Sequence, residues 1–299
     1  MKIPQFKVSP VSLKNKILNF IIFRTMEKRS KNILAKRKRP MVVFANDYIG
    51  INIFLHGEYD SNGLLLFKHI FDHLNIDYRN SSLVDVGANI GNHSLFFGDL
   101  FKKIYSFEPN PTTYELLKIN TENKNISTFN RGLGSKKDKL ILFESLENNG
   151  GSSLHMDKSA HEGKTYTVDI DTLDNFDFSN ELVSVIKIDV EGHEFDVLQG
   201  GKKLIDEMRP IIIFEVHASD FTTRNNTSSL SIDFLTNKNY LFIVPDIKNV
   251  YVTNPTSLWK KFTLLFKSLI FDTSANIKVV NGLLPVGHYD VVAIPAEKY

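Results

Sequence analysis

The sequence of 299 residues contains no cysteine. Disulfide bonds, thiolate nucleophiles and thiolate metal ligands are therefore excluded, and a metal ion would need carboxylate, imidazole or carbonyl ligands. A chain without cysteine suits a reducing compartment, and we expect a cytoplasmic protein. Hydrophobic residues make up 42% of the chain, which is enough to bury a full core, so one main domain with an N-terminal extension is expected.

The N-terminal arm, residues 1–40, is poor in acidic residues and in long apolar runs. It holds twelve Lys and Arg residues against one acid, Glu27, which gives it a net charge of +11. Because the whole chain has a net charge of +2, the remaining residues carry a net charge of −9. Its longest apolar run, Phe20 to Phe23, is far shorter than the roughly 18 residues of a membrane-spanning helix. No small-residue cleavage site follows, and we expect no secretory signal.

A short amphipathic helix is predicted from Leu13 to Met26 in this arm. A cationic arm with an apolar stripe is typical of peripheral contact with an anionic membrane surface, here the inner surface of the cell membrane. A solvated tail, or a helix packed on the core, is the alternative. We expect no nucleic-acid partner, because the arm lacks interleaved aromatic residues and the rest of the chain is acidic. The oligomeric state is left open.

The remaining chain is predicted to form two parts, residues 41–80 and 81–299. The first is expected to be a hairpin of strands at 41–44 and 51–55, followed by a helix at 64–74 that leads into the core. From Leu83, short apolar runs alternate with amphipathic segments, the pattern of βαβ units. Strands are predicted at 83–87, 103–108, 126–130, 183–189, 210–216, 240–245 and 289–294, and helices at about 91–101, 111–120, 193–207 and 227–237. Two further strands, at 139–143 and 164–170, flank a glycine-rich loop at 148–153. This pattern predicts an α/β fold with a mostly parallel seven-stranded sheet and helices on both faces.

The segment from Leu83 to His93 carries the clearest chemical signal. An apolar strand runs into a turn with Gly87 and Gly91 and then into a helix, whose start presents free N–H groups. Glu108 ends the next strand, 21 residues after Gly87, which matches the roughly 20-residue offset of a carboxylate that accepts from ribose hydroxyls. The two signals predict one nucleotide site at the carboxyl ends of these strands.

Charge distinguishes between possible nucleotides at this site. Asp85 would repel the pyrophosphate of a dinucleotide but attract the sulfonium and ammonium groups of S-adenosylmethionine. Asn89 also stands where the dinucleotide fingerprint has its second glycine. A methyl donor is therefore favoured. The alternatives are an NAD-dependent sugar oxidoreductase and a non-catalytic protein of the same fold that acts as a binding or scaffolding partner.

Three blocks of sequence follow one another in order: Val84 to Asn92, Phe107 to Pro111 and Ile186 to Gly200. Together they resemble the FkbM-type methyltransferases, a family of Rossmann-like S-adenosylmethionine enzymes. The resemblance implies O-methylation of a sugar, in a surface glycan for example, or of a secondary metabolite. It also implies a cofactor site and places the acidic turn at 189–194 at the active-site mouth. The predicted cofactor-binding residues are Asp85, Gly87, Ala88, Asn89, Gly91, Asn92, Glu108, Pro109 and Asn110.

A hydroxyl acceptor needs a base, because its pKa lies far above neutrality. The candidate catalytic residues are Asp189, Glu191, His193 and His217, with Glu194, Glu215 and His155 as weaker candidates. A structural interpretation stays open, in which Glu191 and Glu194 favour a helix N-terminus and Asp189 caps it. Asp189, Glu215 and His217 could ligate a divalent cation, but nothing in their spacing requires it, and no metal site is predicted.

Overall fold

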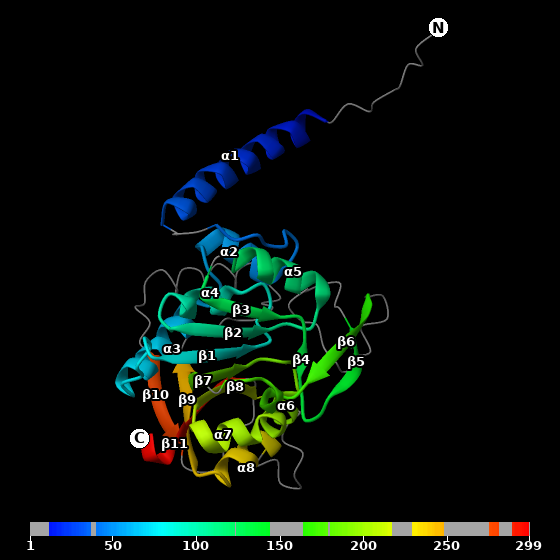
Figure 1. Ribbon diagram of the computed structural model, residues 1–299. Coiled ribbons are helices and arrows are strands. Elements are labelled where there is room, and N and C mark those ends of the chain that lie inside the picture. Colours follow the sequence, from blue (N-terminus) through cyan, green and yellow to red (C-terminus); the bar gives the residue numbers. More distant parts are fainter. Residues whose placement is uncertain are drawn as a thin grey trace. The chain divides into compact units, whose positions relative to one another are not determined.

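The structure is a computed structural model that describes residues 12–36, 40–122, 124–143, 164–178, 180–216, 229–247, 275–280 and 289–298 (Figure 1). The chain divides into two units, Met1–Tyr59 and Asp60–Tyr299. The first unit holds two helices, and the second holds a sheet with helices on both of its faces.

The first unit contains α1 (Leu13–Lys36) and α2 (Tyr48–His56). The predicted arm helix is present and is ten residues longer at its carboxyl end. The predicted hairpin is wrong, because 51–55 lies within α2. Asp47, which lies between the two predicted strands of that hairpin, is the N-cap of this helix, and its carboxylate accepts the N–H of Gly50 at 3.1 Å. Gly57 ends the helix in the left-handed conformation. These two caps favour a helix, although the short run between them contains β-branched residues that are common in strands.

The second unit is built on an eight-stranded sheet in the order β10-β9-β11-β8-β7-β1-β2-β3. The strands are β1 (Ser81–Val86), β2 (Lys103–Phe107), β3 (Ile126–Phe129), β7 (Leu182–Ile188), β8 (Ile211–Val216), β9 (Tyr240–Ile247), β10 (Ala275–Val280) and β11 (Tyr289–Pro295). β8, β7, β1, β2 and β3 are parallel, whereas β11 is antiparallel to both β8 and β9, and β10 is antiparallel to β9. All seven predicted strands are confirmed. β10 is an edge strand that the sequence pattern did not indicate.

Helices cover the two faces of this sheet. They are α3 (Ser61–His73), α4 (Asn92–Gly98), α5 (Pro111–Asn120), α6 (Glu194–Gly200), α7 (Lys202–Met208) and α8 (Leu230–Thr236). α3 and α4 pack with alternate strand residues such as Leu83 and Val185, and α6, α7 and α8 pack with the intervening ones such as Val84 and Ile186. The helix predicted at 193–207 is two short helices that meet at Gly201. The predicted α/β fold class is confirmed.

A second, three-stranded sheet lies beside the main one (Figure 1). Its strands are β4 (Gly132–Leu133), β5 (Asp138–Phe143) and β6 (Thr165–Asp171), in the order β4-β6-β5. β5 and β6 confirm the strands predicted at 139–143 and 164–170. The glycine-rich loop predicted at 148–153 lies outside the described residues.

Candidate active site

The carboxyl ends of β1 and β7 lie side by side at the centre of the main sheet, where the strand order reverses (Figure 1). From β1 the sheet continues to β2 and β3 on one side and to β7 and β8 on the other. Ligands of open α/β sheets bind beyond the carboxyl ends of the strands at such a point. The predicted cofactor segments, after β1 and β2, and the acidic turn, after β7, therefore meet at one edge.

The turn after β1 requires glycine at position 87. Gly87 has a φ of 79°, and a Cβ atom there would lie 1.8 Å from the carbonyl oxygen of Asp189. The N–H groups of Gly87 and Ala88 both donate to the carbonyl oxygen of Phe107, each at 3.0 Å. The turn is thus fixed between the end of β2 and the segment that follows β7.

Glu108, at the end of β2, holds this turn through its side chain. One carboxylate oxygen accepts the N–H of Asn89 at 3.0 Å, and the other accepts the N–H of Asn110 at 2.8 Å. Burial raises the pKa of Glu108 to about 7, against the opposing effect of these two hydrogen bonds. A carboxylate offers about four acceptor positions. Lone pairs therefore remain for hydroxyl donors, and the chemistry of this side chain fits a ribose.

The other predicted cofactor residues frame the same edge. Gly91 is the N-cap of α4, and Asn92 is the first residue of that helix. Asn110 caps α5, because its side-chain oxygen accepts the N–H of Thr112 at 2.9 Å. Pro109 lies between Glu108 and this cap. The structure places these residues together, and their contact with a cofactor stays a prediction.

Asp85 is fully buried beneath this edge. One of its oxygens accepts the hydroxyl of Ser94 at 2.6 Å, and the other lies 3.5 Å from Nζ of Lys187. The same Nζ lies 3.2 Å from Oδ2 of Asp189. Burial alone would lower the pKa of Lys187, but the carboxylates of Asp189 and Asp85 hold it above its ordinary value. Lys187 is therefore a buried ammonium ion that joins the end of β1 to the segment after β7.

The acidic turn after β7 combines an accessible carboxylate with a buried one. The Asp189 side chain is 43% exposed, whereas Glu194 is only 3% exposed. Glu194 accepts the N–H groups of Val190 and Gly192, both at 3.2 Å, and so holds the turn in place. Glu191 has a φ of 52°. The N-cap of α6 is His193, so the alternative in which Asp189 caps this helix is wrong.

Glu215 and Asp290 lie opposite each other at the same edge, on β8 and β11. Asp290 keeps contact with solvent. Partial loss of water around its carboxyl group raises the pKa of Asp290 to about 7, and the negative charges of Asp189, Glu215 and Asp60 raise it further. Sequence reasoning missed both Lys187 and Asp290. A lysine within the apolar run of β7 was a signal for the former, since a buried lysine needs partners. Asp290 gave no signal, because β11 reaches this edge from a distant part of the sequence.

Two predicted histidines, His217 and His155, lie outside the described residues. Within the described ranges, no group of three or more His, Asp or Glu residues is arranged to hold a metal ion. Asp189 and Glu215 lie at one edge, the structure does not describe His217, and no metal site is assigned to these residues.

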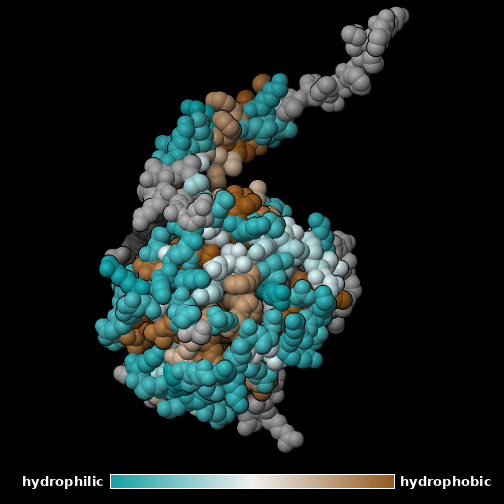
Figure 2. All heavy atoms as spheres, in the orientation of Figure 1, coloured by the Kyte–Doolittle hydropathy of each residue, from teal (hydrophilic) through white to brown (hydrophobic). Residues whose placement is uncertain are grey.

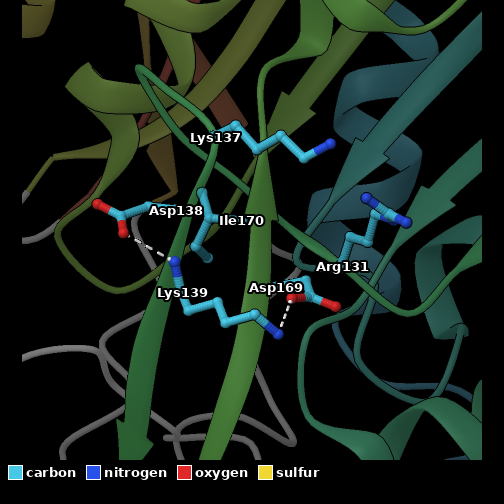
Figure 3. A pocket seen from close by; sticks show the side chains of 6 residues that line it. All are labelled: Arg131, Lys137, Asp138, Lys139, Asp169 and Ile170. Atoms are coloured by element: carbon cyan, nitrogen blue, oxygen red, sulfur yellow. Dashed lines mark hydrogen bonds and ion pairs between the residues drawn. The ribbon is translucent and has the colours of Figure 1, made fainter.

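A pocket of about 530 Å³ opens on the three-stranded sheet rather than at this edge (Figure 3). Charges of both signs line it. Lys139 pairs with Asp169 at 2.9 Å, and Arg131 pairs with Asp171 beside it at 3.1 Å. Lys137, Asp138 and Ile170 complete the lining. Most of these charged side chains form ion pairs, as is common on a solvated surface. The pocket holds none of the predicted site residues.

Comparison with known sequences decides the family. The model of the methyltransferase FkbM domain matches residues 85–242, from the buried aspartate of β1 to the beginning of β9. The chain belongs to the FkbM methyltransferase family. The resemblance seen in the sequence alone is therefore confirmed. This FkbM-family chain is 31% identical over 144 residues to Methyltransferase 1 of Beauveria bassiana, a match that covers 40% of the chain and 58% of that protein.

A second relative is the hexuronic acid methyltransferase AglP of Haloferax volcanii, with 30% identity over 168 residues, 55% of the chain and 64% of the relative. The chain thus spans less than two thirds of the length of both curated relatives. The crystal structure of a methyltransferase FkbM from Methylobacillus flagellatus is 16% identical, with a TM-score of 0.35 over 77% of this chain and 56% of that one.

Proposed function

We propose that this FkbM-family chain is an S-adenosylmethionine-dependent methyltransferase that methylates a sugar hydroxyl. The observation that carries the proposal is Glu108, whose carboxylate bonds to the turn after β1 and stands at the predicted ribose position. The name of the AglP relative, a hexuronic acid methyltransferase, supports a sugar acceptor. Methylation of a secondary metabolite is the alternative acceptor class.

Each residue at this edge has a distinct task in the proposal. When bound, S-adenosylmethionine supplies an electrophilic methyl group. Glu108 accepts hydrogen bonds from its ribose hydroxyls, and Gly87 lets the turn approach closely. Asp189 takes the proton of the acceptor hydroxyl, since it is the accessible carboxylate of the acidic turn. Glu194 keeps that turn in place through its backbone hydrogen bonds.

Calorimetry with S-adenosylmethionine, S-adenosylhomocysteine and NAD tests the donor. We expect both adenosyl compounds to bind and NAD not to bind. Binding of NAD alone would favour the oxidoreductase, and binding of none would favour a scaffold. Glu108→Ala should weaken S-adenosylhomocysteine binding at least tenfold, since a hydrogen bond to a charged group contributes roughly 1.5–3 kcal/mol. Glu115→Ala on α5, whose side chain is 62% exposed, is the matched control and should bind as the wild type does.

The acceptor is tested with glycans extracted from cells that contain or lack the protein. Glycans from cells with the protein should be heavier by one methylene group per modified sugar. Incubation of the unmodified extract with the purified chain and tritiated donor should transfer label to the same sugar. Label on a non-carbohydrate fraction only would contradict the sugar assignment while leaving the donor assignment intact.

We further propose that the arm contacts an anionic membrane surface from the cytoplasm. Its charge is +11, and apolar side chains including Phe20, Ile21 and Phe23 are exposed along α1 (Figure 2). None of the described helices is long and apolar enough to cross a membrane. A chain without residues 1–40 should no longer bind vesicles that contain phosphatidylserine but should still bind S-adenosylhomocysteine. Equal vesicle binding by the full and shortened chains would refute this proposal.

A further inference from the structure

Among the described residues, the charged side chains around Asp189 are mostly carboxylates. The described carboxylates at this edge come from several elements: Asp85 on β1, Asp60 before α3, Glu108 after β2, Glu215 on β8 and Asp290 on β11. His93 on α4 adds no positive charge at neutral pH, because burial and then Lys187 lower its pKa to about 4. Neighbouring negative charges favour protonation of a carboxylate. A base surrounded in this way would tend to be occupied by a proton before it met its acceptor.

Lys187 is the one cation that opposes these charges among the described residues of the edge. It stands directly beside Asp85 in the parallel register of β1 and β7, and Asp189 lies two residues further on the same face. Its Nζ lies 3.2 Å from Asp189 and 3.5 Å from Asp85. An opposite charge at such distances favours the ionised form of a carboxylate. Lys187 thus offsets the negative charge of the carboxylates that surround Asp189.

The two carboxylates that Lys187 contacts differ in exposure, so one lies on the buried side of its ammonium group and the other on the accessible side. Asp85 is fully buried and is bonded to Ser94, so it fixes the inner side of the ammonium group. Asp189 is 43% exposed and can meet a ligand. Lys187 itself is 5% exposed, so it does not meet a ligand directly. Asp189 is thus the accessible partner through which Lys187 can act on the acceptor.

We propose that Lys187 is a positioning residue for methyl transfer: its ammonium group, anchored on Asp85, keeps Asp189 ionised and oriented to take the proton of the acceptor hydroxyl. The inference rests on the proposed function. The proton moves from the acceptor oxygen to a carboxylate oxygen of Asp189, and this transfer requires that Asp189 is ionised beforehand. An ion pair that only stabilised the fold would have no effect on this step.

Three variants separate these cases. Lys187→Met removes the charge and keeps the length of the side chain, Lys187→Arg keeps the charge, and Lys102→Met is the matched control. Lys102 forms an ion pair with Glu181 at 3.4 Å, just before β2 and so at the opposite, amino end of the sheet. If Lys187→Met does not fold, Lys187→Met/Asp85→Asn removes the buried carboxylate charge together with the lysine, and we expect it to fold.

The first measurement is the titration of the Asp189 carboxyl carbon by NMR, assigned with Asp189→Asn. It needs neither donor nor acceptor. Removal of an opposite charge within about 4–6 Å should move the titration midpoint upward by about one pH unit or more in Lys187→Met and in the double variant. Lys187→Arg and Lys102→Met should titrate as the wild type does. An unmoved midpoint in the folded charge-removing variant would overturn the proposal.

The second measurement is the pH profile of tritium transfer from S-adenosylmethionine to the glycan extract. The acidic limb of the turnover rate should move upward by the same amount as the Asp189 midpoint, and Lys187→Arg should restore it. A midpoint that moves without the limb would show a structural ion pair only and would overturn the proposal. Absence of transfer by the wild-type chain would contradict the proposed function instead, and the NMR result would still show whether the ion pair controls Asp189.

Discussion

Glu108→Gln should change the pH dependence of stability, because Glu108 titrates in the folded protein near neutrality. Its ordinary pKa of 4.5 is raised to about 7, chiefly by burial. The folded state therefore binds this proton more tightly than the unfolded state does. The free energy of unfolding that Glu108 contributes is fully present at low pH and is lost as the pH rises towards 7.

The expected magnitude follows from the two pKa values. Between about pH 5.5 and about pH 8.5, this one group should remove about 2 kcal/mol from the free energy of unfolding, at 1.36 kcal/mol per pH unit of differential proton binding. Glutamine cannot ionise, so the variant lacks this loss. Relative to the wild type, Glu108→Gln should therefore be about 2 kcal/mol more stable at the higher pH than at the lower one.

Urea unfolding of both proteins at the two pH values measures this quantity, because all other titrations are common to them and cancel. Glu115→Gln, on the exposed side of α5, should show no change in relative stability with pH. Glu108→Gln should also lose S-adenosylhomocysteine binding, since an amide cannot replace a carboxylate that accepts from two N–H groups and from a ribose. A stability difference that is equal at both pH values would refute the reasoning about burial.

Three further substitutions test the architecture of the second unit, each by urea unfolding. Gly87→Ala should destabilise the fold by at least about 2 kcal/mol, because its Cβ would collide with Asp189 and its φ is positive; wild-type stability would contradict the geometry of the turn. Asn110→Ala removes the cap that accepts from Thr112 and should lose about 1 kcal/mol, and no loss would mean that water replaces the cap. Phe97→Ala empties a fully buried position under the sheet and should lose about 3–5 kcal/mol; a loss below about 1 kcal/mol would imply that the core collapses around it.

Sequence alone predicted most of the central sheet, because its strands are continuous apolar runs bounded by turns. β1, with Leu83 and Val84 on opposite faces, is a clear example, and both residues are fully buried. The hairpin failed because the run from Ile51 to Leu55 has the composition of a strand. Its conformation is decided by the caps on either side, Asp47 and Gly57, and the sequence pattern indicated neither of them as a helix cap.

The candidate site was predicted where its residues are close in sequence. Gly87 and Glu108 follow consecutive strands, so their spacing was informative. Asp290 could not be found in this way, because it reaches the edge through the pairing of β11 with β8. Lys187 was within the third block of the resemblance, yet its two ion pairs depend on the register of β1 against β7, which the sequence does not display.

The position of β11 has a consequence for how the protein is made. This strand comes after all the others in sequence, yet it lies between β8 and β9. A nascent chain that has emerged from the ribosome only as far as β9 therefore has an unfilled place inside its sheet, with the backbone of β8 open to pairing. Open strand edges recruit other chains. Slow synthesis of the region between β9 and β11 should therefore favour aggregation, and holding chaperones should protect the chain until β11 arrives.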